Sequence, residues 1–231
     1  SADFTKKNRQ KLFSKIATGD FDAIIVGHSQ LLKVPVSQEF QSKIIQKQIY
    51  EMSEALADIR NTDKNSFTVK QMEKMKDDLE VKLSKLLESP KRDDVIDFEQ
   101  LGVDKLFVDE AHLFKNLMIT TKMSNISGLS TNANIQKTMD LYAKCQYLDE
   151  ITGGKGIVFA TGTPVSNSIS EIYTMMRYLQ SNLLERNGMN YFDAWAANFA
   201  ETITESQLMP EGGGYQMKTR FAKFTNMPEL M

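Results

Sequence analysis

The sequence predicts an α/β protein in which a parallel sheet is interrupted by an inserted antiparallel helical hairpin. Three short apolar runs, at residues 22–26, 106–108 and 156–160, are each followed by polar residues, as expected for buried strands. Amphipathic stretches of helical spacing follow two of these runs, and alternation of strand and helix favours parallel strands with right-handed crossovers. Two longer stretches of helical spacing between the first two runs predict the hairpin.

The composition is that of an ordinary soluble globular protein. The chain has 231 residues, 41% of them hydrophobic and 25% charged, which suits one large domain or two small ones. A formal net charge of −2 gives no overall attraction to nucleic acid, so DNA contacts would come from local patches. The one cysteine, Cys145, excludes an internal disulfide and fits a reducing cytoplasmic location. No apolar run approaches the ~20 residues of a membrane helix, so we expect no membrane association.

The N-terminal part of the chain is predicted to form a basic helix and then a strand. Residues 4–17 have an amphipathic spacing, and their lysines could touch phosphates, although a solvated helix face is the simpler interpretation. The strand predicted at residues 22–26 ends in four polar or small residues. The glycine allows close backbone approach and the next three side chains offer hydrogen-bonding groups to a ligand or a nucleic-acid backbone. These four candidates are Gly27, His28, Ser29 and Gln30.

The predicted hairpin comprises residues 38–60 and 67–89. Apolar residues recur at spacings of three and four in both arms, Thr68 and Gln71 have the spacing of a capping box, and Pro90 ends the second arm. We expect the hairpin to project from the sheet, with its two apolar stripes packed on each other. A role in binding a partner or guiding DNA is the alternative. The stripes are Ile45, Ile49, Met52, Leu56 and Ile59, and Met72, Met75, Leu79, Leu83 and Leu86.

Two adjacent carboxylates, Asp109 and Glu110, directly follow the apolar run Leu106–Val108. They would lie at the C-terminal end of a buried strand, where open α/β sheets bind their ligands. One carboxylate can hold Mg²⁺ through its water shell, while the other can take a proton from an attacking water. The competing interpretation is a strand that ends in a solvated acidic turn.

The remaining chain alternates loops, helices and one strand. A polar stretch that runs to Asn134 is predicted to be a long loop on the side of the site, and residues 135–150 to be a helix with Cys145 in its core-facing pattern. The strand at 156–160 runs into a tight turn with two hydroxyls, formed by Thr161, Gly162 and Thr163. A helix is predicted at 168–180, capped by Ser166 or Asn167. Its predicted buried residues are Ile169, Ile172, Met175, Met176 and Leu179. The last predicted elements are a helix at 191–200 and a β-hairpin at 202–208 and 215–221.

In a parallel sheet the polar ends of the three strands, 27–30, 109–112 and 161–163, would fall along one edge. Their order resembles the first RecA-like lobe of superfamily-two helicase-like ATPases, whose name-giving Asp-Glu-Ala-His box stands at 109–112. The closer resemblance is to Swi/Snf-type DNA translocases, through Lys115-Asn116, the Thr-Gly-Thr-Pro segment at 161–164, Asn167 and Glu171. Residues 4–37 are similar to a branch in phages and conjugative elements, often fused to an adenine-specific DNA methyltransferase.

This resemblance implies ATP and Mg²⁺ as cofactors, duplex DNA as partner and a second RecA-like lobe elsewhere. Asp109 would bind the Mg²⁺ of MgATP through water, and Glu110 would polarise the hydrolytic water. His112 would link the nucleotide site to Thr161–Thr163, which would couple hydrolysis to lobe movement. Gly27–Gln30 would contact the DNA backbone, and Asn167 would help to begin the following helix.

The sequence departs from the family pattern at the phosphate loop. No Gly-x-x-x-x-Gly-Lys-Ser/Thr segment is present, and the glycines of Thr152–Gly156 precede a strand where a phosphate loop would open a helix. We therefore interpret residues 1–36 and 91–231 as a partial lobe one, with 37–90 as the inserted hairpin. The isolated chain is expected to bind ATP weakly and not to hydrolyse it measurably, because the second lobe and its arginine finger are also missing.

Two other functions fit parts of the pattern. A degenerate lobe could have kept the fold, lost catalysis and become an interaction module that binds a partner or DNA through the helical hairpin. A metal-dependent nuclease would also use paired carboxylates, but such sites usually gather several carboxylates around one or two metals. Only Asp109 and Glu110 stand at a convincing strand end.

Overall fold

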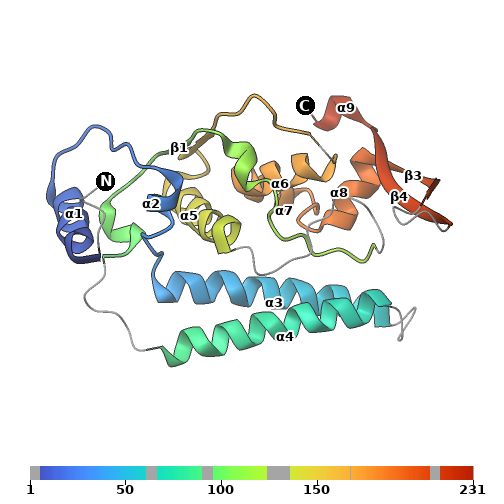
Figure 1. Cartoon of the computed structure of the whole chain (residues 1–231), viewed down its shortest axis with the longest axis horizontal. Coiled ribbons are helices and arrows are strands. Elements are labelled where there is room, and N and C mark those ends of the chain that lie inside the picture. The colour runs from blue at the N-terminus through green and yellow to red at the C-terminus, as the bar shows by residue number, and fades with distance from the viewer. Residues whose placement is uncertain are drawn as a thin grey trace.

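Two short strands pair in parallel at the centre of the chain, as the sequence predicts. They are β1 (Leu106–Val108) and β2 (Ile157–Phe159), with Phe107 opposite Val158. The computed structural model describes residues 6–60, 67–89, 96–123, 136–166, 168–208 and 214–230. Within these ranges the molecule is a mixed α/β protein that contains many helices and one small parallel sheet (Figure 1). Three residues that carry predictions lie outside the described part, namely Pro90, Asn167 and the side chain of Thr68.

The predicted first strand, at residues 22–26, is wrong. These residues form neither helix nor strand, and the side chain of Ile25 is 99% exposed. A strand is stabilised by a hydrogen-bonded neighbour, and in the described part of the chain β1 pairs with β2 and with no third strand. The segment instead connects α1 (Lys6–Thr18) to the short helix α2 (His28–Leu31).

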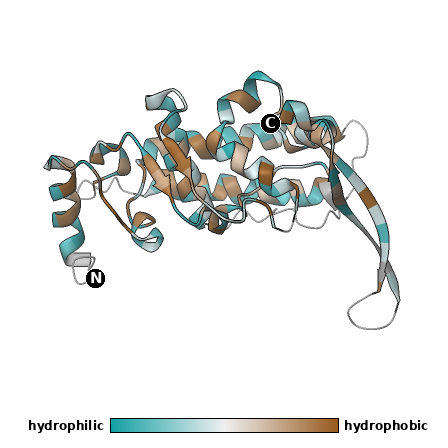
Figure 2. Ribbon diagram, turned by 90° about the horizontal axis from the view of Figure 1, so that it is seen from above, coloured by the Kyte–Doolittle hydropathy of each residue, from teal (hydrophilic) through white to brown (hydrophobic). Residues whose placement is uncertain are grey.

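One face of the parallel pair is covered and the other is bare. Helix α5 (Gln136–Thr152) packs beside β2, and Val108 belongs to the same core as Cys145 and Leu148. On the opposite face Phe107 is 72% exposed and its partner Val158 is 47% exposed. Figure 2 shows both strands in the brown of apolar residues. Parallel sheets normally have both faces covered, so this pair presents an unusual amount of apolar surface.

The helical hairpin forms as predicted, with α3 (Gln38–Arg60) and α4 (Phe67–Glu88) side by side. The arms are antiparallel, because the Gln38 side chain at the start of α3 donates to the carbonyl of Leu86 near the end of α4. Both arms bury apolar residues in one hydrophobic core. They include Ile45, Met52 and Leu56 from α3, and Val69, Met72, Met75 and Leu79 from α4.

The hairpin does not project from the body, which corrects the expectation. It lies along the length of the molecule, with α3 between α4 and the other helices (Figure 1). A row of polar side chains on one face of α3 contacts the body, and this face fixes the hairpin against it. The row consists of Lys43 with Glu150, Lys47 with Glu185, Glu54 with the Tyr191 hydroxyl, and Asp58 with Lys122.

The C-terminal part has its own aromatic core. It contains α6 (Ser170–Leu179), α7 (Ser181–Arg186) and α8 (Phe192–Phe199), and Trp195 packs there against Tyr173 and Phe192. The predicted β-hairpin is present as β3 (Ala200–Leu208) and β4 (Tyr215–Phe224), and it extends away from the body (Figure 2). The chain then forms α9 (Met227–Leu230). No helix in the described ranges is long and apolar enough to span a membrane.

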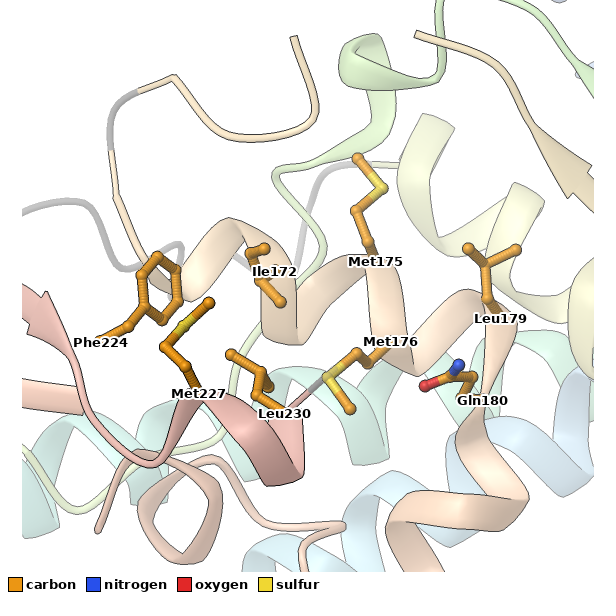
Figure 3. A pocket seen from close by; sticks show the side chains of 8 residues that line it. All are labelled: Ile172, Met175, Met176, Leu179, Gln180, Phe224, Met227 and Leu230. Carbon is orange, nitrogen blue, oxygen red and sulfur yellow. The ribbon is translucent and has the colours of Figure 1, made fainter. Parts of the chain in front are cut away.

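Helix α6 buries a different face from the predicted one. Of the five predicted residues only Ile169, just before the helix, is buried, whereas Glu171, Thr174 and Arg177 are buried despite their polarity. The other predicted residues line an open apolar groove of about 290 Å³ between α6 and α9 (Figure 3). Its lining is Ile172, Met175, Met176, Leu179, Gln180, Phe224, Met227 and Leu230.

Candidate functional site

The acidic turn, residues 109–112, begins where β1 ends and is joined to the end of β2. The amide of Ala111 donates to the carbonyl of Ala160 over 3.0 Å, and the amide of Ala160 donates to Val108 over 2.9 Å. The backbone reverses at Glu110, which has the left-handed conformation with φ 50°. Both carboxylates are exposed, and Asp109 Oδ1 accepts a hydrogen bond from the amide of Glu110 at 2.9 Å. The carboxylates thus face solvent at the C-terminal edge of the sheet.

His112, the last residue of the acidic turn, contacts both Glu110 and the hydroxyl turn, which comprises residues 161–163. It lies in the short helix η3 (Ala111–Phe114), and its Nδ1 is 3.1 Å from Glu110 Oε2 and 3.2 Å from Thr161 Oγ1. The Thr161 hydroxyl also accepts a hydrogen bond from the amide of Thr163, at 3.2 Å. One imidazole nitrogen therefore contacts both turns, although the roles of these residues in catalysis and coupling stay predictions.

The segment Gly27–Gln30 reaches the same site without being the end of a strand. The His28 ring packs edge-on against Phe114, with ring centroids 5.2 Å apart. Gly27 and Gln30 close the start of α2, since the Gly27 amide donates to Gln30 Oε1 at 2.9 Å. Two of the three predicted clusters are therefore joined through the sheet and His112, whereas the third contacts Phe114, which lies in the same short helix η3 as His112.

A buried lysine that sequence reasoning missed fixes the position of α2. Lys144 of α5 is fully buried, pairs with Asp140, and donates to the carbonyl of Leu31 at 3.0 Å. Burial lowers the pKa of Lys144 and raises the pKa of Asp140, and their mutual attraction opposes both shifts. The burial of Lys144 could have been predicted from the sequence, because Lys144 is three residues beyond Leu141 on a helix whose apolar pattern faces the core.

The segment that leaves the acidic turn is held by α6. The Tyr178 hydroxyl contacts the carbonyl of Phe114 at 3.1 Å, and Arg177 Nη1 donates to the carbonyl of Met118 at 2.8 Å. Residues 117–119 are buried, so the predicted long loop begins within the core. Residues 124–135, which carry the rest of that prediction, lie outside the described part.

The donor set at the acidic turn fits Mg²⁺. Asp109 and Glu110 offer exposed carboxylate oxygens, and protein-bound Mg²⁺ commonly takes one or two carboxylates while it keeps several waters. In the described ranges no group of three or more His, Cys, Asp or Glu side chains is placed to hold a metal. Gly153 and Gly154 have positive φ and follow the end of α5, so they close a helix, whereas a phosphate loop opens one.

Comparison with known proteins gives a family. The whole chain, residues 1–231, matches the family described as "Probable helicase domain". The chain belongs to this helicase-domain family. It is also similar to "Defense against restriction protein B" of Escherichia phage P1, with 29% identity over 135 residues, or 58% of this chain. The similar region is 6% of the length of that phage protein. No solved structure matches.

The helicase-domain assignment confirms the predicted family at its coarser level. The acidic turn and the hydroxyl turn lie close together in this helicase domain, and their assignment as a shared site stays a prediction. Resemblance to the Swi/Snf type and fusion to a methyltransferase stay predictions.

Proposed function

We propose that this helicase domain is part of a DNA-dependent ATPase that moves along duplex DNA, and that it supplies part of a RecA-like lobe. One observation carries the proposal. Two exposed carboxylates stand at the C-terminal edge of a parallel strand pair, and His112 connects one of them, Glu110, to the hydroxyl turn through 3.1 Å and 3.2 Å contacts. This arrangement supports a nucleotide site that is connected to a second, movable segment.

In this proposal the three polar residues of the acidic turn have separate tasks. Bound MgATP would supply the phosphoryl group and the charge neutralisation for its transfer. Asp109 would hold the metal through water, and the Glu110 carboxylate would accept a proton from the attacking water. His112 would keep Glu110 oriented, since its Nδ1 lies 3.1 Å from Glu110 Oε2. The contact of His112 with Thr161 would pass changes at the carboxylates to the hydroxyl turn.

The proposed DNA contact is the segment Gly27–Gln30. Its His28 ring touches Phe114, which lies two residues beyond the acidic turn, so a contact with the DNA backbone could be sensed at the carboxylates. The complete protein would contribute the phosphate loop, a second RecA-like lobe and its arginine finger. Further parts of the proposal are an attached adenine-specific methyltransferase and a cytoplasmic location. A contribution to defence against restriction is also proposed, because the phage relative carries that name.

The test is ATP hydrolysis by the complete native polypeptide, with and without duplex DNA, beside its Glu110→Gln variant. We expect DNA to stimulate the wild-type protein. Glu110→Gln should bind MgATP normally and lose hydrolysis by about 100-fold or more, because it removes a general base. Glu201→Gln, the same change at an exposed position of β3, is the matched control and should behave as wild type.

A second candidate function is an interaction module that has lost catalysis. The open apolar groove between α6 and α9 favours it, because such a groove can accept apolar side chains of another protein (Figure 3). No hydrolysis by either protein would contradict the motor and favour this module, whereas equal hydrolysis by both would contradict the role of Glu110 as the base.

A further inference from the structure

A buried ion pair lies behind the acidic turn, where the chain leaves the site. Lys115 follows η3, and its Nζ is 3.0 Å from Oε1 of Glu171 in the first turn of α6. The two side chains are only 14% and 7% exposed. Lys115 Nζ also contacts the Ser166 hydroxyl, and the other oxygen of Glu171 accepts a hydrogen bond from the Ser166 amide at 2.6 Å. Three segments therefore meet at one carboxylate.

The same segments are also joined at their other end. The amide of Ala111 donates to Ala160 at 3.0 Å, and His112 Nδ1 contacts Thr161 Oγ1 at 3.2 Å. Lys115 lies beyond His112 in the chain, and Ser166 lies beyond Thr161. The hydroxyl turn is therefore held at its start by the contact between Thr161 and His112, and beyond its end by the contacts of Ser166 with the ion pair.

Stability alone does not explain this pair. Removing two charges from water offsets most of their attraction, so buried ion pairs can often be replaced by apolar residues without loss of stability. Charge-assisted hydrogen bonds are, however, short and directional, so they fix geometry well. Because Glu171 uses one oxygen for Lys115 and the other for the Ser166 backbone, its position sets the spacing of both segments.

We propose that Lys115 and Glu171 are a positioning pair that holds the hydroxyl turn in register with the acidic turn and connects both to α6. The inference rests on the proposed function, since it takes the acidic turn to act on ATP. Neither side chain is assigned a contact with nucleotide or DNA. A shift of the hydroxyl turn during hydrolysis reaches α6 through Ser166 and Glu171. Breaking the pair therefore weakens the response of hydrolysis to DNA and leaves nucleotide binding intact.

The experiment is a double-mutant cycle in the complete native polypeptide, with Lys115→Met, Glu171→Gln and the double variant. Met keeps the apolar length of Lys115, and Gln keeps an oxygen that can accept from the Ser166 amide. The measured quantities are kcat with and without duplex DNA, the KM for ATP and the Tm. A matched control applies the same two changes to the exposed pair Lys43 and Glu150, whose side chains are 60% and 50% exposed.

We expect each single variant to lower the ratio of DNA-stimulated to basal kcat by about tenfold. The KM for ATP should not change, and the double variant should be no worse than the poorer single variant, because both changes break one interaction. The Lys43 and Glu150 control should keep the wild-type ratio. A merely structural pair would lower the Tm and leave the ratio unchanged, and that result would overturn the inference.

Glu110→Gln, measured in parallel, separates this inference from the proposed function. A wild-type protein that is stimulated by DNA, a dead Glu110→Gln variant and unchanged ratios at Lys115 and Glu171 reject the positioning pair alone. A wild type without DNA-stimulated hydrolysis rejects both. Where a single variant does not fold, since it leaves one charge buried alone, the double variant decides: a lowered ratio supports the pair and an unchanged ratio rejects it.

Discussion

At the scale of single residues, Asp149 in α5 shows how burial changes a carboxyl group. This residue is only 5% exposed, and its Oδ1 has no hydrogen-bond partner in the described part of the chain. Burial raises its pKa from 3.8 to about 6, against the opposing effect of the Ser181 hydroxyl. The folded protein therefore binds a proton at a pH where the unfolded chain has already lost it.

This shift predicts a pH dependence of stability. Between pH 3.8 and about 6 the folded state binds more protons than the unfolded state, so stability falls as the pH rises through this window. Asp149→Asn should raise the Tm by a few degrees at pH 8 and give no gain at pH 4. Thermal unfolding from pH 4 to pH 8 measures this, with Asp104→Asn at an exposed position as control. A Tm difference that is the same at every pH would contradict the assignment.

The sequence predicts site residues well where chain order alone places them. Asp109 and Glu110 follow an apolar run directly, and His112 lies within one turn of them, so the strand brings all three to one edge. The contact of Lys115 with Glu171 and the contact of Lys144 with α2 were not predictable, because each depends on how a distant segment folds back. The partner of Lys115 is in α6, and a partner of Lys144 is the carbonyl of Leu31.

At the scale of elements, periodicity predicts where helices lie better than it predicts which face is buried. The sequence places α6 correctly, but its polar residues Glu171 and Arg177 face inward. Glu171 pairs there with a lysine, and Arg177 donates to a backbone carbonyl. Residues 22–26 fail for the opposite reason. Their apolar composition suits a strand, but a strand also needs a neighbour, and a single segment does not reveal whether one exists.

The hairpin gives a test at the element scale, because α4 carries two leucines in opposite environments. Leu79 is 2% exposed and faces α3, whereas Leu87 is 58% exposed. Leu79→Ala should destabilise the chain by about 2–5 kcal/mol, since it removes buried methyl groups and leaves a cavity. Leu87→Ala should change stability by less than about 0.5 kcal/mol. Denaturant unfolding followed by circular dichroism measures both, and equal effects would mean that the stripe is not the interface.

At the scale of the whole molecule, the two faces of the sheet differ in what covers them. Helix α5 and the row of polar contacts along α3 make one side of the body continuous, whereas Phe107 and Val158 leave apolar surface on the strands. Exposed apolar surface beside a free sheet edge favours association with another chain. We therefore expect the isolated chain to self-associate at high concentration.

Replacement of Phe107 should weaken that association. Phe107→Thr keeps a residue that suits a strand and removes an aromatic ring that is 72% exposed. Tyr215→Thr is the matched control, since Tyr215 is also a strand aromatic, is 71% exposed and lies far along the chain in the β-hairpin. Light scattering over a concentration series should show a lower mean mass for Phe107→Thr only. Equal masses for the two variants would show that association uses another surface.

The left-handed backbone at Glu110 has a consequence for how such a domain can evolve. A residue with a side chain costs about 1–2 kcal/mol in that conformation, and glycine or asparagine would fit it more easily. Selection for thermal stability alone would therefore favour the loss of this glutamate. If the proposed function is correct, copies of the domain that no longer need to turn over ATP would be expected to change at this position early.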